Sequence, residues 1–526
     1  MKNLKLMNVL LVLFLLVTLV GCSGGNSDGG QGGGDAPAVV NDTVNIVLTT
    51  APVGLHPLKT NDAPSTYVTA QMFETLYRRT MDGTSYVPLL AAELPIFSED
   101  GKTATIKLRN DVKFHDGTPF TAAAVAYMID CLKDPNYGSQ RPSIVESIES
   151  YNIVDDYTID LNLAYEDGVL TAKLAHTNGC IVNPALDQSQ DLLVNPAGAG
   201  TGPYKYVSSV TGDNYVLEAN PDYYGTNGGV GKIVYNVVQQ ENTAISRLKT
   251  GEADFIPTIA ADSFNEASQI DGYTAVSTPS SAIMYMAMRS SAETAVNPLM
   301  ANLDFRKMIL EAIDIPTYTT SMMGGHATYA KSIVGPTLVG YTPAMDDFCI
   351  TYNFEDAKAI CDANNWAGQK VVMLVPSRDG QSNFAAYVQD QLTQLGLEVE
   401  VKGEEWGTFL DDAKKDAYCD FTVLTWSNVT GDGQQMLEPN FSTKNGVRLK
   451  WNNAEFDAYV QASAQTSVMA EREANMLEAV KLIQGQAIVS PIYSTNALFC
   501  YNSNKLSNVG LDKGGMFYVY DWVLNK

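Results

Sequence analysis

The segment that most constrains this chain is its amino terminus, which has the pattern of an export signal. Lys2 and Lys5 precede an apolar run from Val9 to Val20, and the run stops at Gly21. A positively charged start followed by a short apolar stretch is typical of a cleaved secretory signal. At ~1.5 Å per residue the run would reach roughly 18 Å, short of the ~30 Å hydrocarbon core of a bilayer. We therefore expect the rest of the chain to be exported and to fold outside the cytoplasm.

The residues Leu19-Val20-Gly21-Cys22 resemble a bacterial lipobox, in which the Cys receives a diacylglycerol and becomes the first residue. Two or more acyl chains hold a soluble domain at a membrane for long times. Residues 1–21 would then be removed, and the Gly-rich residues 22–41 would tether the protein flexibly to the outer face of the cytoplasmic membrane. A chance Cys beside an ordinary signal-peptidase site is the alternative. The GCSGG at this point matches a hydrolase G-x-S-x-G only formally, since that motif needs a strand before it and a helix after it.

Size and charge narrow the class of protein. The ~490 residues after the tether exceed what one core normally organises, so two or three domains are expected. Hydrophobic residues make up 45% of the chain, and no later apolar run is long enough to span a membrane. The formal charge of −25 becomes about −27 once the two lysines of the signal are removed. This acidity argues against nucleic acid or an anionic lipid surface as a partner.

Residue types that carry chemistry are scarce. After Cys22 six cysteines remain, and export permits disulfides, but fifteen pairings are possible for six Cys and the connectivity stays open. The four His are scattered, and no Cys or His has a metal-ligand spacing. There is no phosphate-binding G-x-x-x-x-G-K-[ST] loop and no evident nucleophile with a base beside it. We expect no metal, no cofactor and no catalysis.

The secondary structure predicted from periodicity is mixed. TVNIVLTT and ATIKLRNDVKF alternate apolar and polar residues and are predicted to be strands. Thr121 is placed to cap a helix with one buried face, because the apolar residues Val125, Met128, Ile129 and Leu132 fall at i, i+3, i+4 and i+7.

The second half of the chain contains a β-α-β pattern. VVMLVP is predicted as a buried strand, 384–395 as a helix stopped by Gly396, and LEVEVK as a further strand parallel to the first. An amphipathic helix is expected near 471–483, and strands at PIYSTNALFCY and FYVYDW. The fold class is therefore α/β, in more than one domain.

A series of motifs along the mature chain resembles the extracellular solute-binding proteins of peptide and nickel ABC transporters, family 5. Its most recognisable segment runs from MFETLYRRTMDG through IKLRNDVKFHDGTPFTAAAVAYMI. Further matches follow in order: GTGPYKYV, LEANPDYYG, ISRLKTGEADF, LDFRKMILEAID, EDAKAICDANNW, EEWGTFL and YCDFTVLTW. Each is weak alone, but together they cover nearly the whole mature chain.

The resemblance implies a two-lobed, periplasmic-binding-protein-like fold of class II (cluster C) with an extra inserted domain. Lobe I would comprise 42–68, 200–283 and 497–526. The inserted domain would span 69–199 and generally not carry the ligand, and lobe II would span 284–496. Two crossings between the lobes suit rigid-body closure on a ligand.

The resemblance also indicates where a peptide would be held. Peptide-binding members have a tryptophan in the strand that matches YCDFTVLTW, followed three residues later by an Asp that pairs with the peptide ammonium. Trp426 matches the tryptophan, but Val429 stands in place of the Asp. Asp432 would replace it if the loop is displaced, or is a solvated turn residue. Asn428 is a further candidate in this stretch.

Three more residues are candidates for ligand contact. Arg289 stands where many members have Asn, and it would suit a carboxylate or phosphate on the ligand or a surface or hinge salt bridge. His56 stands in Leu-His-Pro where the family usually has Leu-Asp-Pro. Trp406 and Trp426 would stack on an apolar or ring-bearing ligand, with core packing the alternative for Trp406.

The function that the resemblance implies is capture of a small solute for import. The protein would act as a monomer that binds a peptide or peptide-like solute and delivers it to the permease subunits of an ABC transporter. An oligosaccharide or other solute, or a sensor without transport, remains the alternative, and a secreted hydrolase is a distant third.

Overall fold

A computed structural model describes residues 42–377, 379–428, 430–446 and 448–525. The predicted signal, the lipobox Cys22, the tether and Val429 lie outside these residues. Within the described residues, no helix combines the length and apolarity needed to cross a bilayer.

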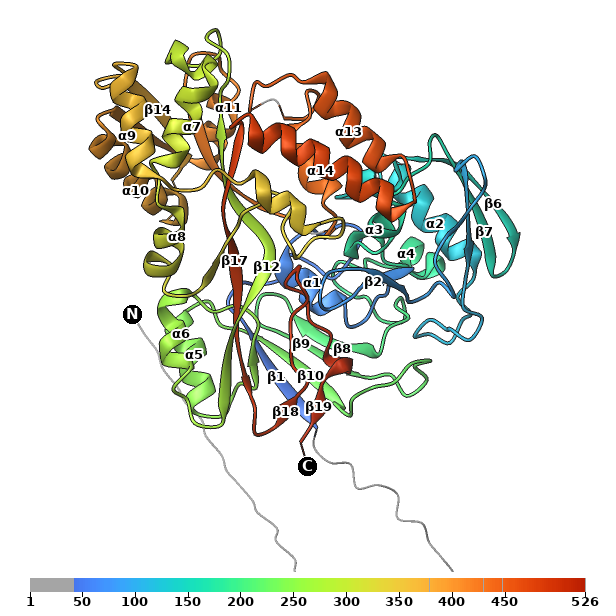
Figure 1. Cartoon of the computed structure of the whole chain (residues 1–526). Helices are drawn as coiled ribbons and strands as arrows, with labels where there is room; N and C mark the ends of the chain where they lie inside the picture. The colour runs from blue at the N-terminus through green and yellow to red at the C-terminus, as the bar shows by residue number, and fades with distance from the viewer. Residues whose placement is uncertain (1–41, 378, 429, 447, 526) are drawn as a thin grey trace, which may run out of the picture. The chain divides into compact units, whose positions relative to one another are not determined.

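One large mixed sheet runs through the described chain (Figure 1). Its strands lie side by side in the order β15 (Glu398–Glu404), β14 (Lys370–Pro376), β16 (Phe421–Ser427), β12 (Tyr273–Met288), β17 (Val489–Asn502), β11 (Phe255–Ile256), β1 (Thr43–Leu48), β10 (Lys232–Val237), β9 (Asn214–Ala219) and β8 (Tyr204–Val210). The short β13 (Ala327–Tyr329) pairs with β17.

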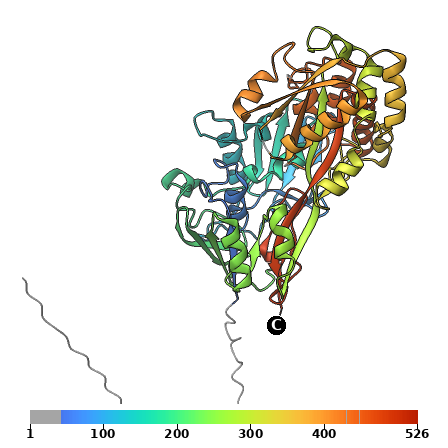
Figure 2. The ribbon, with the colours of Figure 1, turned by 90° about the vertical axis from the view of Figure 1, so that its left-hand side faces the viewer.

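Strands β12 and β17 connect the two ends of this sheet. They pair antiparallel with each other, from Tyr273 opposite Asn502 to Ala287 opposite Val489. Figure 2 shows the red β17 beside the yellow-green β12, running from the end that carries α5 (Glu241–Lys249) and α6 (Ala261–Ala267) towards the helices of residues 300–490. The pairing shifts register between Pro279 and Ile283, so the two strands are irregular in the middle.

The β15–β17 half of the sheet is covered by helices on both faces. Successive side chains of a strand point to opposite faces, so Met284 and Met286 of β12 enter one hydrophobic core and Ile283 and Tyr285 enter another. The first core contains residues of α7 (Leu303–Glu311), α9 (Phe354–Ala363) and α10 (Asp379–Leu395). The second contains residues of α11 (Trp406–Asp412), α12 (Gln434–Phe441), α13 (Ala454–Ala464) and α14 (Met469–Gly485).

The segment 69–199 packs on the part of the large sheet that contains β1, β10 and β9. A four-stranded antiparallel sheet has the order β4 (Ile96–Phe97), β5 (Thr103–Lys107), β7 (Thr158–Leu163), β6 (Ile148–Asp155), and β2 (Tyr77–Arg79) pairs with β3 (Tyr86–Pro88). Its helices are α2 (Ala122–Lys133), α3 (Leu170–Leu174) and α4 (Pro184–Ser189), and α1 (Ala63–Thr69) leads into it. One hydrophobic core joins this segment to β1, β9 and β10.

Short elements complete the described chain. Helix α8 (Ile315–Thr317) leads into a π-helical turn (Tyr318–Met322), and β18 (Leu506–Ser507) pairs with β19 (Val523–Leu524). The 3₁₀ turns are Pro142–Val145, Thr177–Gly179, Pro298–Ala301, Pro343–Phe348 and Val519–Asp521.

Most elements predicted from periodicity are confirmed. The β-α-β unit is present, with β14 and β15 parallel, and α10 ends at Leu395 before Gly396, whose φ is +106°. All four apolar residues predicted for the buried face of α2 are buried. Thr121 occupies the position before α2, but its side chain makes no capping hydrogen bond.

The strand predicted at FYVYDW is wrong. Residues Val519–Asp521 form a 3₁₀ turn, and only Val523–Leu524 are extended in a strand. The aromatic side chains account for the difference, because the rings of Phe517 and Trp522 stack with centroids 5.6 Å apart. A regular strand would point residues five apart to opposite faces.

The six cysteines that follow Cys22 form no disulfide in the described structure. All six are free thiols, and five of them are buried.

Candidate functional site

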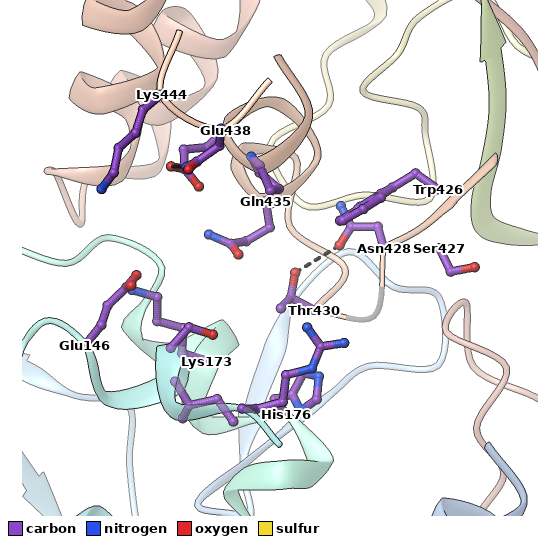
Figure 3. Close-up of a pocket in the computed structure, with 15 residues that line it drawn as sticks. Glu146, Lys173, His176, Trp426, Ser427, Asn428, Thr430, Gln435, Glu438 and Lys444 are labelled. Carbon is purple, nitrogen blue, oxygen red and sulfur yellow. Dashed lines mark hydrogen bonds and ion pairs between the residues drawn. The ribbon is translucent and has the colours of Figure 1, made fainter. Parts of the chain in front are cut away.

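A cavity of about 620 Å³ lies between residues 141–176 and residues 426–445 (Figure 3). Trp426 and Asn428, both predicted from the sequence, line it together with the helix that follows them. The opposite wall includes Glu146, Lys173 and His176. Two stretches about 250 to 300 positions apart in the sequence thus line one open cavity.

The wall that contains Trp426 is built from the end of β16 and the start of α12. Trp426 is the penultimate residue of β16 and is half-buried at the cavity. Asn428 follows the strand, and its amide accepts hydrogen bonds from Thr430 Oγ1 (2.9 Å) and Gly431 N (3.0 Å) while donating to Asp432 O (2.8 Å). Because both ends of the Asn428 amide are used in this way, its role is to hold the loop in shape beside Trp426.

The opposite wall carries a charged cluster. Lys173 on α3 pairs with Asp167 at 2.8 Å and with Glu146 at 3.3 Å. Burial works against the charge of Lys173, but the nearby Asp167 and Glu146 carboxylates more than offset it and raise its pKa. Lys173 is therefore a permanent cation at the cavity.

Carboxylates face this cavity from both walls. Glu438 lies on α12 and Glu146 on the other wall (Figure 3). The pKa of Glu438 is raised, first by burial and then by the negative charge of Glu146. Since Arg141 and Lys444 also line the cavity, both signs of charge are available to a ligand.

A second, smaller cavity of about 140 Å³ adjoins the first, because His176 and Thr430 line both. Burial lowers the pKa of His176 to about 3, so its imidazole is neutral near neutral pH. Its Nδ1 accepts a hydrogen bond from Asn178 N at 3.0 Å, which leaves the proton on Nε2. His176 thus presents a hydrogen-bond donor where the two cavities meet.

Asp432, the proposed replacement for the missing ammonium partner, lies in a buried ion pair. It is fully buried, and its Oδ1 lies 2.7 Å from Nη2 of Arg472 and accepts from Gln434 N. The interpretation of Asp432 as a solvated turn residue is wrong, because no part of it reaches solvent. Its Oδ1 pairs with Arg472, its Oδ2 has no hydrogen-bond partner among the described residues, and it lines a different cavity from that of Trp426.

Arg289, Trp406 and His56 are also placed away from the Trp426 cavity. Arg289 is buried and donates from Nη2 to the carbonyl oxygens of Ala413 (2.6 Å) and Lys415 (3.3 Å). Trp406 begins α11, is 39% exposed and stacks on a neighbouring Phe of the same helix.

His56 is held in a buried polar cluster of the 69–199 segment. Its Nδ1 accepts from Leu58 N (3.2 Å), and its Nε2 therefore donates to Asp187 Oδ1 (2.9 Å). Tyr137 donates to the other carboxylate oxygen at 2.6 Å. These bonds fix the connection between the first strand and the segment that follows it.

Several cavity residues carry no motif in the sequence. Glu146, Lys173 and His176 belong to 69–199, the segment expected to stay away from the ligand, yet they line the cavity. On α12, Gln435 and Glu438 are three residues apart and so share one face of the helix. In the sequence, these two cavity residues are indicated by their three-residue spacing directly after the Trp426 loop.

Comparisons with known proteins agree with this architecture. Residues 85–447 match the family model of bacterial extracellular solute-binding proteins, family 5. The glutathione-binding protein GsiB of Pectobacterium atrosepticum is 26% identical over 472 residues, covering 86% of this chain and 88% of that protein. The oligopeptide-binding protein AppA of Bacillus subtilis is 24% identical over 492 residues, covering 89% of each.

A solved structure shows the same fold. HbpA2 from Haemophilus parasuis superposes with a TM-score of 0.83 at 20% identity, covering 92% of this chain and 100% of that one. The fold is therefore the two-lobed α/β fold expected from the sequence motifs. Because the family model spans more than half of the sequence, the chain belongs to family 5 of the bacterial extracellular solute-binding proteins.

Proposed function

We propose that this protein is the substrate-binding receptor of an ABC importer and that it captures peptides or peptide-like solutes without chemical conversion. The observation that carries the proposal is the 620 Å³ cavity with Trp426 on one wall and charges of both signs around it. Ligand cavities in proteins usually measure ~300–1,000 Å³. Relatives described as binding oligopeptides and glutathione support a peptide-like ligand.

The charges of the cavity suit a zwitterion better than a neutral sugar. Glu438 and Glu146 offer negative charge to an ammonium group, which compensates for the Val429 that stands in place of the usual Asp. Lys444 and Arg141 offer positive charge to carboxylates. The Trp426 ring offers an apolar face for a side chain or for the peptide backbone. Arg289, Trp406, His56 and Asp432 are not part of this proposed site.

We propose that the cavity closes by movement of two lobes. Lobe I comprises 42–68, 200–283 and 497–526, lobe II comprises 284–496, and 69–199 is inserted in lobe I. The register shift between Pro279 and Ile283 supports a hinge, since it interrupts β12 beside the proposed boundary. Small-angle scattering should give a smaller radius of gyration with ligand. An unchanged radius at saturation would contradict closure.

We also propose a lipid anchor at Cys22 that holds the monomeric receptor on the outer face of the membrane beside its permease. The lipobox-like residues before Cys22 and the Gly-rich stretch after it support this. Cys22→Ala should move the processed protein from the membrane fraction to the medium or the periplasm. Retention in the membrane fraction after processing would refute the anchor.

Native mass spectrometry of protein purified without refolding tests the ligand class. A retained peptide or peptide-like solute would support the proposal, and a retained sugar would overturn it. With the retained solute as ligand, Trp426→Ala should weaken binding by about 2 kcal/mol, roughly 30-fold in Kd. Trp406→Ala is the matched control and should leave Kd unchanged, because Trp406 lies outside the cavity. Equal losses in both variants would show that the site is misplaced.

A further inference from the structure

Arg79 is a buried cation whose hydrogen-bonding capacity is largely unused. It ends β2, is 6% exposed, and neither Nη1 nor Nη2 has a hydrogen-bond partner among the described residues. Its nearest carboxylate oxygen, Oδ1 of Asp512, lies 3.8 Å from Nη2, beyond hydrogen-bond distance. That oxygen already accepts from Gly514 N (2.8 Å) and Met516 N (2.9 Å). The buried guanidinium thus has Asp512 as an ion-pair neighbour, but both of its Nη atoms keep unused hydrogen-bonding capacity.

Two glycines leave room for the guanidinium. A Cβ at Gly431 would lie 1.7 Å from Nη1 of Arg79, and a Cβ at Gly514 would lie 3.1 Å from Nη2. Gly431 has a φ of +75°, a conformation that glycine adopts without strain. The guanidinium therefore lies between the loop that follows Trp426 and the carboxyl-terminal segment.

Arg79 lines the second cavity, which shares His176 and Thr430 with the Trp426 cavity. The neutral His176 carries its proton on Nε2, because its Nδ1 accepts from Asn178 N. The cationic Arg79 and the neutral His176 therefore both line this cavity of about 140 Å³ beside the proposed ligand site, and each can donate hydrogen bonds. The two Nη atoms of a guanidinium match an acceptor with two oxygens.

We propose that Arg79 forms a carboxylate-recognition subsite of the ligand cleft, in which its two Nη atoms bind one carboxylate of the solute. The inference rests on the proposed function and narrows the ligand to a solute with a free carboxylate. The cationic part of such a solute lies in the first cavity near Glu438, and the carboxylate lies in the second. The carboxylate is either the terminus of a peptide or an acidic side chain.

Three short peptides separate these sources: trialanine, trialanine amide, and Ala-Glu-Ala amide. Isothermal titration should show trialanine binding the wild-type protein ~10- to 100-fold more tightly than trialanine amide, as expected for loss of a charge-assisted bidentate bond. If Ala-Glu-Ala amide recovers the affinity, the subsite also accepts a side-chain carboxylate. Equal affinities for all three peptides would overturn the subsite while leaving peptide capture intact.

Arg79→Gln should abolish the preference for the acid over the amide, to within about threefold. Arg78→Gln is the matched control, since it removes the same charge from the next residue along β2. Arg78 pairs instead with Asp521 (3.1 Å) and Tyr520, so its variant should keep the preference. A preference that persists in Arg79→Gln would refute the assignment, and the wild-type comparison decides the matter even if that variant does not fold.

A second measurement separates failure of the proposed peptide binding from failure of the Arg79 subsite. If none of the peptides binds, thermal unfolding with millimolar succinate provides the second readout. Succinate should raise the Tm of the wild type and of Arg78→Gln but not that of Arg79→Gln. Absence of this difference would overturn the subsite independently of the ligand class.

Discussion

Replacement of Glu74 by Gln should remove a specific pH dependence of stability. Glu74 lies in the segment 69–199 and is buried among hydroxyl donors. Its Oε1 accepts from Tyr223 and Tyr224, both at 2.8 Å, and its Oε2 accepts from Thr201 Oγ1 at 2.9 Å. Burial raises the pKa of Glu74 to about 7, although these hydrogen bonds and the charge of Arg109 oppose the rise.

The size of the effect follows from that pKa. A carboxyl whose pKa rises from 4.5 to about 7 on folding corresponds to about 3 kcal/mol, at about 1.4 kcal/mol per pKa unit. The folded state binds the proton more tightly than the unfolded state. The contribution to stability is therefore full below about pH 4.5 and is lost as the pH rises through about 7. A Gln cannot titrate, yet its amide oxygen still accepts from both tyrosines and its NH₂ can donate to Thr201.

Urea denaturation at a series of pH values measures this difference. The stability of the wild type relative to Glu74→Gln should fall by about 3 kcal/mol between about pH 4 and about pH 8. His115 and His176, whose pKa values are lowered by burial to about 4 and about 3, impose the opposite dependence but do so equally in both proteins. Glu266→Gln, at an exposed ion pair with Lys249, is the control and should show a constant difference. A constant difference for Glu74→Gln as well would refute the raised pKa.

Two further substitutions test the frame around the cleft. Asp432→Asn should lower stability by about 3–5 kcal/mol in urea unfolding, because it leaves the Arg472 guanidinium buried without its carboxylate. A change below about 1 kcal/mol would show that this pair is solvated. Gly168→Ala should cost about 1–3 kcal/mol, since its Cβ would lie 1.8 Å from the carbonyl oxygen of Thr466. The control Gly407→Ala has open space around its Cβ and should be neutral, so equal effects of the two alanines would contradict the packing shown at Gly168.

Local sequence patterns predict an element correctly where the burial of apolar side chains determines its structure. The apolar run of β14 agrees with the structure because the strand is buried on both faces, with Val371 in one core and Val372 in the other. The periodicity of α10 agrees because the helix buries one face against the first of these cores. Residues 517–522 differ because ring stacking between Phe517 and Trp522 outweighs the strand propensity of an aromatic run. The side chain of Thr121 makes no cap, which the residue type alone could not reveal.

The candidate site could be predicted only in part, for a related reason. Trp426 lines the cavity, and the family motif predicts both its strand and its place at the end of that strand. The charges of Arg289 and Asp432 suggest ligand contact, but whether a charge faces a ligand or a neighbouring carbonyl or guanidinium depends on contacts between distant segments. His176 and Arg79 reach the cleft through the packing of the segment 69–199 on the Trp426 loop, and no local pattern encodes that approach.

The claim that the solute lies between residues 141–176 and 426–445 can be tested by hydrogen–deuterium exchange of the full-length receptor. The comparison is between protein that retains its co-purified solute and the same protein after the solute is removed. Bound solute should slow exchange in both walls together, around Lys173 and His176 on one side and from Trp426 through α12 on the other. Protection confined to one wall, or found only in segments outside these two, would contradict the placement of the site.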